Sequence, residues 1–273
     1  MSFINFLHNY QPQRICFQLG LFNFYWYGLL IVTAIIIGFY LTLKLAEKKN
    51  IKKEASIDLF LYLIIFGFLG ARIYHVLSEF SYYLANPLEI LKVWQGGLGI
   101  FGTILAGLAV LFLYSRKAKI SFLVLADLFT PALILGQAIG RWGNWFNQEL
   151  YGKPTNLPWG IPIGLDNRLT GFENYQYFHP VFLYESIWNF LVFVVLIFLI
   201  KKPRKSGLIF ALYLILYSFG RFFIEFLKID PQPIFLGLRL AQIVAILMLL
   251  VGLVILLKRN SKFQSASWRT NPK

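Results

Sequence analysis

The chain contains few charged residues and a single cysteine. Charged side chains make up 14% of its 273 residues, whereas a soluble domain carries about 25%. Cys16 has no second cysteine with which to form an intrachain disulfide or a cysteine-based zinc site. No histidine motif surrounds it, so a buried thiol is a better expectation than a nucleophile. A disulfide scaffold is excluded, and an ordinary soluble enzyme is disfavoured.

Long uncharged apolar runs take the place of the missing charge. Hydrophobic residues make up 58% of the chain, and the runs 21–43, 93–115 and 240–257 hold no Asp, Glu, Lys or Arg. Each run has about the 20 residues that a helix needs to cross a bilayer, and four more segments qualify once one or two charges are allowed. We therefore expect an all-α integral membrane protein, a single transmembrane domain over residues 1–273. Its seven spans are predicted at about 21–43, 58–79, 93–115, 120–140, 181–200, 207–228 and 237–257.

The basic residues predict an orientation. Of the 26 Lys and Arg residues, 17 follow spans one, three, five and seven, and the alternate connections hold few. Because basic loops stay in the cytoplasm, the N-terminus is expected outside and the C-terminus in the cytoplasm. A nucleic-acid partner is disfavoured, since no basic face exists beyond these short loops. The basic residues concerned are Lys44, Lys48, Lys49, Lys52, Lys53, Arg116, Lys117, Lys119, Lys201, Lys202, Arg204, Lys205, Lys258, Arg259, Lys262, Arg269 and Lys273.

The longest connection between spans is residues 141–180. It contains Pro154, Pro158 and Pro162 with several glycines, which forbid a long regular helix. It also contains Trp159, Phe172 and several tyrosines, too many aromatics for a disordered tether, and such side chains favour the depth of the lipid headgroups. We expect a folded extracytoplasmic cap resting on the outer leaflet.

The segment 140–152 begins this connection and carries the densest set of polar groups. A cation, Arg141, is followed by Asn144, Asn147 and Glu149 at the end of an apolar run. Charge at such a place is costly, so function is its default explanation. Arginine offers a planar fork suited to phosphate, and glycine lets backbone approach a ligand. The segment predicts a site for an anionic headgroup at the membrane surface.

Further polar residues lie in or next to other spans, each with a purely structural alternative. Arg221 and Glu225 are four residues apart and share a helix face; they bind a ligand together or only neutralise each other. Arg72 ends span two and either binds a ligand or extends its guanidinium to the interface. His179, at the start of span five, is by itself more often an interfacial histidine than a base.

These motifs together resemble a known family. Residues 140–152 are similar to the pattern G-R-x-G-N-[FW]-x-N-x-E-x-[WY]-G of the prolipoprotein diacylglyceryl transferases, enzymes of the bacterial inner membrane, and the resemblance covers nearly the whole chain. Its other matching motifs are Tyr25-Trp26-Tyr27-Gly28, Gly70-Ala71-Arg72, Gly96-Gly97-Leu98, His179-Pro180 with Leu183-Tyr184-Glu185, and Gly220-Arg221 with Glu225 and Asp230.

The resemblance implies a reaction in the outer leaflet. Such enzymes move the diacylglyceryl group of phosphatidylglycerol to the lipobox cysteine of a prolipoprotein signal peptide, which forms a thioether and releases glycerol-1-phosphate. The bilayer and these two substrates are the implied partners, and no cofactor, metal or nucleic acid is implied. By resemblance the catalytic residues are Arg141, Arg221, Glu149 and Tyr27, and the substrate-binding residues are Arg141, Asn144, Gly152, Arg72, Glu225 and His179.

One position departs from the family pattern. Where many members have a histidine after the G-G segment, this chain has Phe101. Either another group, such as His179 or Glu149, takes the proton of the thiol, or the thiol ionises in the field of the arginines, which we favour. The alternatives to the enzyme are a membrane lipid transporter, for which neither paired broken helices nor an inverted repeat is visible, and a non-catalytic relative.

Overall fold

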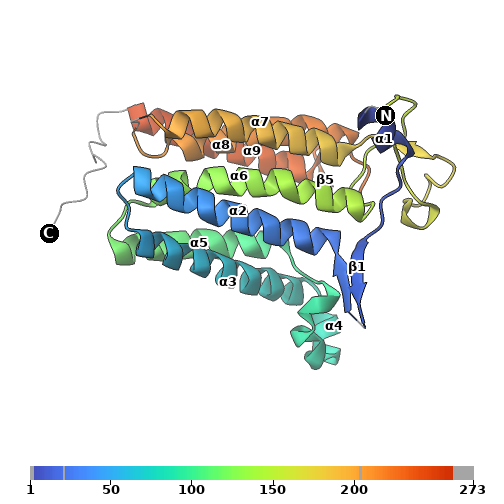
Figure 1. Ribbon diagram of the computed structural model, residues 1–273, viewed down its shortest axis with the longest axis horizontal. Helices are drawn as coiled ribbons and strands as arrows, with labels where there is room; N and C mark the ends of the chain where they lie inside the picture. The colour runs from blue at the N-terminus through green and yellow to red at the C-terminus, as the bar shows by residue number, and fades with distance from the viewer. Residues whose placement is uncertain (1–2, 21, 203–204, 261–273) are drawn as a thin grey trace. The chain divides into compact units, whose positions relative to one another are not determined.

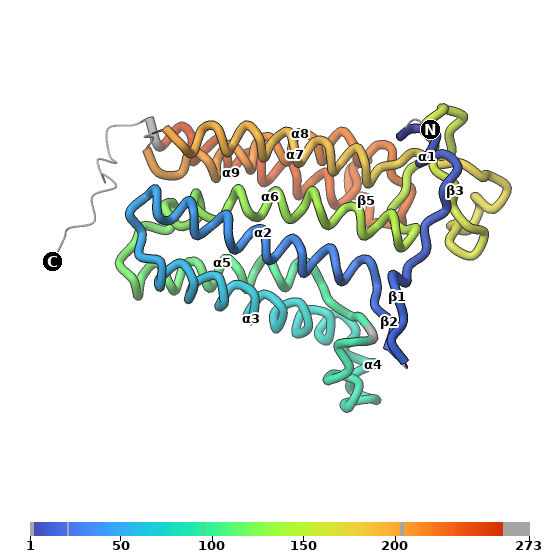
Figure 2. Tube along the Cα trace, viewed as in Figure 1, coloured from blue at the N-terminus to red at the C-terminus, as the bar shows by residue number. Residues whose placement is uncertain are grey.

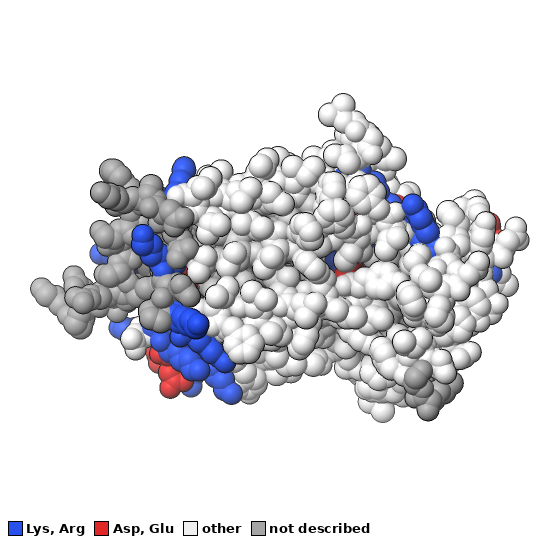
Figure 3. Space-filling model, turned by 90° about the horizontal axis from the view of Figure 1, so that it is seen from above, with Lys and Arg blue, Asp and Glu red and all other residues white. Residues whose placement is uncertain are grey.

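The computed structural model describes residues 3–20, 22–202 and 205–260. Seven of its helices are long and apolar enough to cross a membrane, which confirms the all-α membrane fold (Figure 1). The sides of these helices carry few charges, and Figure 3 shows a broad uncharged surface on the face in view. The seven helices are α2 (Trp26–Lys48), α3 (Lys53–Ser78), α5 (Ile100–Ala118), α6 (Phe122–Phe146), α7 (Val181–Ile200), α8 (Leu208–Ile224) and α9 (Leu240–Asn260).

Several predicted span boundaries move by a few residues, and two of the starts have a local cause. The third span begins at Ile100 rather than at residue 93, because Gly96 and Gly97 have positive φ angles of 97° and 74° and end the short 3₁₀ helix η2 (Val93–Gln95). The first span begins at Trp26 rather than at residue 21, because strand β2 (Phe22–Tyr25) pairs there with β1 (Ile15–Leu19). The orientation of the termini stays a prediction, and Arg204, Lys262, Arg269 and Lys273 lie outside the described residues.

The contacts within the chain divide it into two compact units, and the prediction of a single domain remains a prediction. The first unit contains residues up to Leu41 and those from Phe129 onward. In it α7, α8 and α9 run side by side (Figure 2), and α6 joins α7 through the Ser186 hydroxyl, which donates to the carbonyl of Ala138 at 2.9 Å. The start of α2 packs on the end of α6, where the rings of Trp26 and Phe146 stack at 4.7 Å.

The cap of the first unit is folded, as predicted, and comprises residues 147–180. Helix α6 continues to Phe146, so the cap begins later than the predicted residue 141. The helix persists there because its polar side chains have partners on α7: the indole of Trp142 donates to Ser186 at 3.0 Å. Short helix α1 (Phe3–Asn9) and strands β3 (Ile161–Pro162) and β4 (Tyr177–Phe178) complete this region. Its buried core consists of Leu7, Trp145, Tyr151, Ile161, Ile163, Phe178 and Phe182.

The first unit ends in a short hairpin before its last helix. After α8 the chain forms the 3₁₀ helix η4 (Glu225–Leu227), then strands β5 (Ile234–Phe235) and β6 (Leu238–Arg239), which pair antiparallel. Helix α9 starts directly after Arg239. The hairpin therefore returns the chain so that the start of α9 faces the end of α8, with which it packs.

The second unit spans residues 42–128 within the described chain. Helices α3 and α5 pack closely in it, since a Cβ added at Gly70 would lie 2.5 Å from the Cβ of Ala106 and 2.6 Å from the carbonyl oxygen of Gly102. Small residues permit such an approach, and a Cβ added at Gly67 would likewise lie 3.4 Å from Cγ2 of Thr103 on α5. Helix α4 (Phe80–Ala85), η1 (Pro87–Leu91) and η2 connect α3 to α5.

Candidate functional site

The carboxylate of Glu185 binds three cations. Glu185 lies in the second turn of α7 and is 5% exposed. Its Oε2 is 2.7 Å from Nε of Arg141 on α6, and its Oε1 pairs with Nη1 of Arg221 on α8. The same Oε1 lies 3.4 Å from Nζ of Lys228. A single buried carboxylate thus brings together cations that are up to 87 residues apart in the sequence.

A second carboxylate, Glu225, extends this group of charges. It is fully buried, its Oε2 is 2.7 Å from Nη2 of Arg221, and its Oε1 is 2.8 Å from Nε of Arg239. The guanidinium of Arg239 also lies 3.2 Å from Oδ1 of Asp230 and donates to the carbonyls of Lys228 and Asp230 at 2.5 Å each. We call these residues the charged cluster: Arg141, Glu185, Arg221, Glu225, Lys228, Asp230 and Arg239.

The charged cluster carries four cations and three carboxylates, a surplus of one positive charge. Burying ions is costly unless they are paired, and here every ion has an opposite partner within 3.4 Å. The side chain of Arg141 is 22% exposed, that of Arg221 is 15% and that of Lys228 is 2%. Burial lowers the pKa of Lys228, while the nearby Glu185 raises it. An anion that entered would therefore meet Arg141 first, beside a cluster that can accept negative charge.

The end of α6 connects Arg141 to Glu149. Nη1 of Arg141 donates to the side-chain oxygen of Asn144 at 3.3 Å, and the Asn144 amide donates to Oε1 of Glu149 at 2.8 Å. The backbone N–H of Glu149 donates to the Asn144 carbonyl, which folds the chain back on the helix end. The reversal takes place at Gln148, a buried residue with a left-handed φ of 54°. Glu149 therefore orients Arg141 through Asn144.

Two glycines of the segment 140–152 permit close contacts. A Cβ at Gly143 would lie 1.8 Å from Cδ2 of Tyr27, so the tyrosine ring rests directly on the α6 backbone. A Cβ at Gly152 would lie 2.8 Å from Cβ of His179 and 2.9 Å from the carbonyl oxygen of Leu227. Gly152 thus lets the cap approach both the start of α7 and the turn that carries Lys228. The predicted role of Gly152 in binding substrate stays a prediction, as does that of Tyr27 in catalysis.

His179 belongs to a chain of hydrogen bonds at the start of α7. Its Nδ1 lies 3.2 Å from the hydroxyl of Tyr184, which also accepts from the indole of Trp159 at 2.9 Å. Burial lowers the pKa of His179, and the cation of Lys153 lowers it further. The imidazole is thus favoured in its neutral form, which can accept a proton or a hydrogen bond. Its predicted contact with substrate remains a prediction.

Arg72 lies in the second unit and binds backbone. Its Nε donates to the carbonyl of Ile90 at 2.9 Å, its Nη1 to those of Gly96 and Gly97 at 2.9 Å each, and its Nη2 to that of Glu89 at 2.5 Å. The guanidinium also lies 5.2 Å from the ring centre of Tyr83. Arg72 organises residues 89–97, and its predicted role in binding substrate is left as a prediction.

Phe101, also in the second unit, lies in the first turn of α5. Its ring is 5.8 Å from that of Tyr74, and the residue is 41% exposed. Phenylalanine cannot accept a proton, so a base at this position is absent from this chain. Within residues 3–20, 22–202 and 205–260, moreover, no group of three or more His, Cys, Asp or Glu side chains is arranged to hold a metal ion.

Four members of the charged cluster were not among the predicted site residues: Glu185, Lys228, Asp230 and Arg239. Glu185 and Asp230 stand in the matched motifs without a predicted role, and Lys228 lies between two residues of such a motif. Arg239 gave only one signal, its position directly before a charge-free run of 18 residues. A cation at the start of an otherwise uncharged helix needs a partner. That argument alone could have identified Arg239.

Comparison with known proteins agrees with this geometry. The family model described as prolipoprotein diacylglyceryl transferase matches residues 14–258. A phosphatidylglycerol–prolipoprotein diacylglyceryl transferase of Trichormus variabilis is 43% identical over 89% of this chain and 88% of its own length. Enzymes of the same name from Synechocystis and Fervidobacterium nodosum are each 44% identical, over 88% and 86% of this chain and 87% and 81% of their own lengths. The chain belongs to the prolipoprotein diacylglyceryl transferase family.

Proposed function

We propose that this protein transfers the diacylglyceryl group of phosphatidylglycerol to the thiol of a lipobox cysteine in a prolipoprotein signal peptide. The observation that carries the proposal is the pairing of Arg141 and Arg221 with one carboxylate, Glu185. Two guanidinium groups from different helices are thereby held at one place, in a chain whose family and relatives bear the name of this reaction. The protein acts in the bacterial inner membrane, with its site toward the outer leaflet.

The reaction needs stabilisation of a leaving phosphate. The sulfur of the substrate cysteine attacks the glycerol carbon that bears the phosphate ester, a carbon–sulfur bond forms and the carbon–oxygen bond breaks. The electron pair leaves with the oxygen of glycerol-1-phosphate, so one more negative charge develops on the phosphate. Donors aimed at a developing charge lower the barrier most. Arg141 and Arg221 supply these donors, and the surplus positive charge of the charged cluster accepts the added negative charge.

The proton of the thiol leaves before or during the attack. A free cysteine thiol has a pKa of about 8.5, and nearby cations lower it. The charged cluster provides such cations, so the substrate thiol ionises in their field and releases its proton to water, without a histidine at position 101. Asn144, held between Arg141 and Glu149, orients the headgroup, and Glu225 holds Arg221.

Mass spectrometry of a lipobox peptide tests the proposal. The peptide is incubated with the purified protein in phosphatidylglycerol liposomes, and a diacylglyceryl mass gain on its cysteine is expected. Arg141→Ala abolishes the gain, whereas Arg116→Ala at the end of α5 leaves it intact. No gain with the wild-type protein, while an active relative modifies the peptide in parallel, contradicts the proposal. Movement of fluorescent phosphatidylglycerol across the bilayer without peptide modification would instead favour a transporter.

A further inference from the structure

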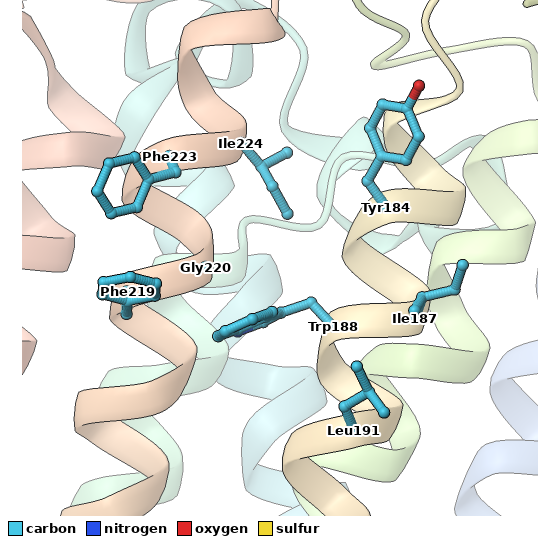
Figure 4. A pocket seen from close by; sticks show the side chains of 8 residues that line it. All are labelled: Tyr184, Ile187, Trp188, Leu191, Phe219, Gly220, Phe223 and Ile224. Atoms are coloured by element: carbon cyan, nitrogen blue, oxygen red, sulfur yellow. The ribbon is translucent and has the colours of Figure 1, made fainter.

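An apolar groove lies between α7 and α8 in the first unit. Its volume is about 440 Å³, and Figure 4 shows the side chains that line it. Leu191, Phe219 and Phe223 are each about half exposed, at 54%, 49% and 54%. Exposed side chains of this kind on membrane helices face lipid, so the groove is open to acyl chains.

Gly220 and Trp188 form the floor of the groove. A Cβ at position 220 would lie 2.1 Å from Nε1 of Trp188, so the indole rests against the α8 backbone. The same Nε1 donates to the carbonyl of Leu216 at 2.9 Å. Because the indole is held by this bond and no side chain stands at position 220, the space above it stays open.

The groove and the charged cluster are built on the same two helices, from residues that alternate along them. Tyr184 lines the groove and the next residue is Glu185; Gly220 lines it and the next residue is Arg221; Ile224 lines it and the next residue is Glu225. From Tyr184 to Leu191 the groove follows about 10 Å of α7, at about 1.5 Å per residue. One leaflet of hydrocarbon is about 15 Å thick. The groove thus has the length of most of an acyl chain's path through one leaflet.

We propose that this groove binds one acyl chain of the phospholipid donor while the donor's phosphate lies at the charged cluster. The proposal rests on the proposed function. Arg221, the residue after Gly220, and the apolar side chains along the groove match an anionic headgroup with its hydrocarbon tail. Within a bilayer a chain gains little by leaving other lipids, so the groove contributes orientation: it fixes the glycerol carbon relative to the attacking sulfur.

A competition between two donors tests the groove. Wild-type protein and variants receive equal amounts of dimyristoyl phosphatidylglycerol and methyl-branched diphytanoyl phosphatidylglycerol in one vesicle, and the two peptide products are counted by mass spectrometry. Their ratio does not depend on how much protein is folded. The wild type is expected to prefer the unbranched donor, Leu191→Ala to reduce that preference several-fold, and Leu191→Trp to increase it. Leu247→Ala and Leu247→Trp on α9, a leucine that is 57% exposed, should leave the ratio unchanged; equal effects at both positions overturn the proposal.

Photolabelling tests occupancy without requiring catalysis. Phosphatidylglycerol or phosphatidylcholine with a diazirine in mid-chain is irradiated with the wild-type protein in otherwise identical vesicles. Peptides from residues 181–200 and 208–224 should be labelled several-fold more by the phosphatidylglycerol probe. Equal labelling by both probes means that bulk lipid fills the groove, and it overturns the proposal. A wild-type protein that makes no product but shows the selective labelling contradicts the proposed function and supports the groove.

Discussion

Arg221 in the first unit, with a side chain that is 15% exposed, and Arg72 in the second, which is buried, both lie toward the end of a membrane helix, yet their partners differ. Arg221 pairs with the carboxylates of Glu185 and Glu225. Arg72 donates to four backbone carbonyls, and no carboxylate in the described part of the chain forms an ion pair with it. Carboxylates hold a cation by charge, and a phosphate can share that cation by the same means. Backbone carbonyls instead bind the guanidinium through directed hydrogen bonds, and these bonds also fix the conformation of the loop, residues 89–97, that carries the carbonyls.

The guanidinium of Arg221 is therefore available to bind a substrate anion, whereas that of Arg72 serves the structure of the loop. In the charged cluster the opposite charges nearly balance, so an added anion finds a cation without leaving a carboxylate unpaired. At Arg72 four of the five guanidinium N–H groups are already used. We therefore expect substitutions at the first site to change activity, and substitutions at the second to change stability.

The largest effect is expected for Glu185→Gln. The amide keeps the shape of the side chain but removes the charge that binds Arg141, Arg221 and Lys228, so three cations face one another. Removing one partner of a buried ion pair costs about 3–5 kcal/mol. The variant should unfold at a much lower temperature in detergent and lose transfer activity. Glu173→Gln in the cap, at an exposed carboxylate, is the control, and equal melting temperatures for the two variants would contradict the central role of Glu185.

Matched Arg→Lys substitutions test the comparison directly. Lysine cannot reproduce a bidentate fork, so Arg221→Lys should lower kcat about 10²–10³-fold, the loss typical of a transition-state donor. Arg72→Lys should destabilise the fold by about 2–4 kcal/mol, since it loses most of four hydrogen bonds at roughly 1 kcal/mol each. The kcat of folded Arg72→Lys should stay near the wild-type value. A raised KM for phosphatidylglycerol with unchanged stability would instead confirm the predicted substrate contact of Arg72.

A smaller effect is expected for Arg239→Lys. Arg239 itself is not predicted to touch the substrate, but it holds Glu225 and the turn at Lys228 and Asp230. Lysine can keep one of these contacts, and the looser Glu225 should let Arg221 shift, with a loss of about tenfold in kcat and little change in KM. Arg116→Lys at the end of α5 serves as the control. An unchanged kcat would limit Arg239 to stabilising the start of α9.

The sequence predicted the seven helices and the folded cap, and it singled out three of the seven members of the charged cluster, Arg141, Arg221 and Glu225, because apolar runs and motif residues are local properties of the chain. It did not predict that the carboxylate of Glu185 binds three cations. Glu185 and Arg141 are separated by the whole cap, so no spacing rule indicates that they pair. The partners of Arg72 are backbone carbonyls, which leave no trace in residue type. The late start of α5 could have been predicted from the pair Gly96-Gly97, whereas the groove could not, since it depends on how α7 and α8 pack.

The smallest effect is expected for Lys228→Arg and appears as a change with pH. Burial lowers the pKa of Lys228 in the folded protein, so the unfolded chain binds this proton more tightly. Stability should therefore rise with pH between the folded and the unfolded pKa of this lysine. Activity should fall over the same interval, because the charged cluster loses a cation. Arginine stays charged there, so kcat of Lys228→Arg should persist to higher pH than that of the wild type. The ratio of the two kcat values therefore reports the charge of Lys228, including its effect on ionisation of the substrate thiol. A ratio that stays constant across the alkaline range would show that the charge of Lys228 does not contribute to catalysis.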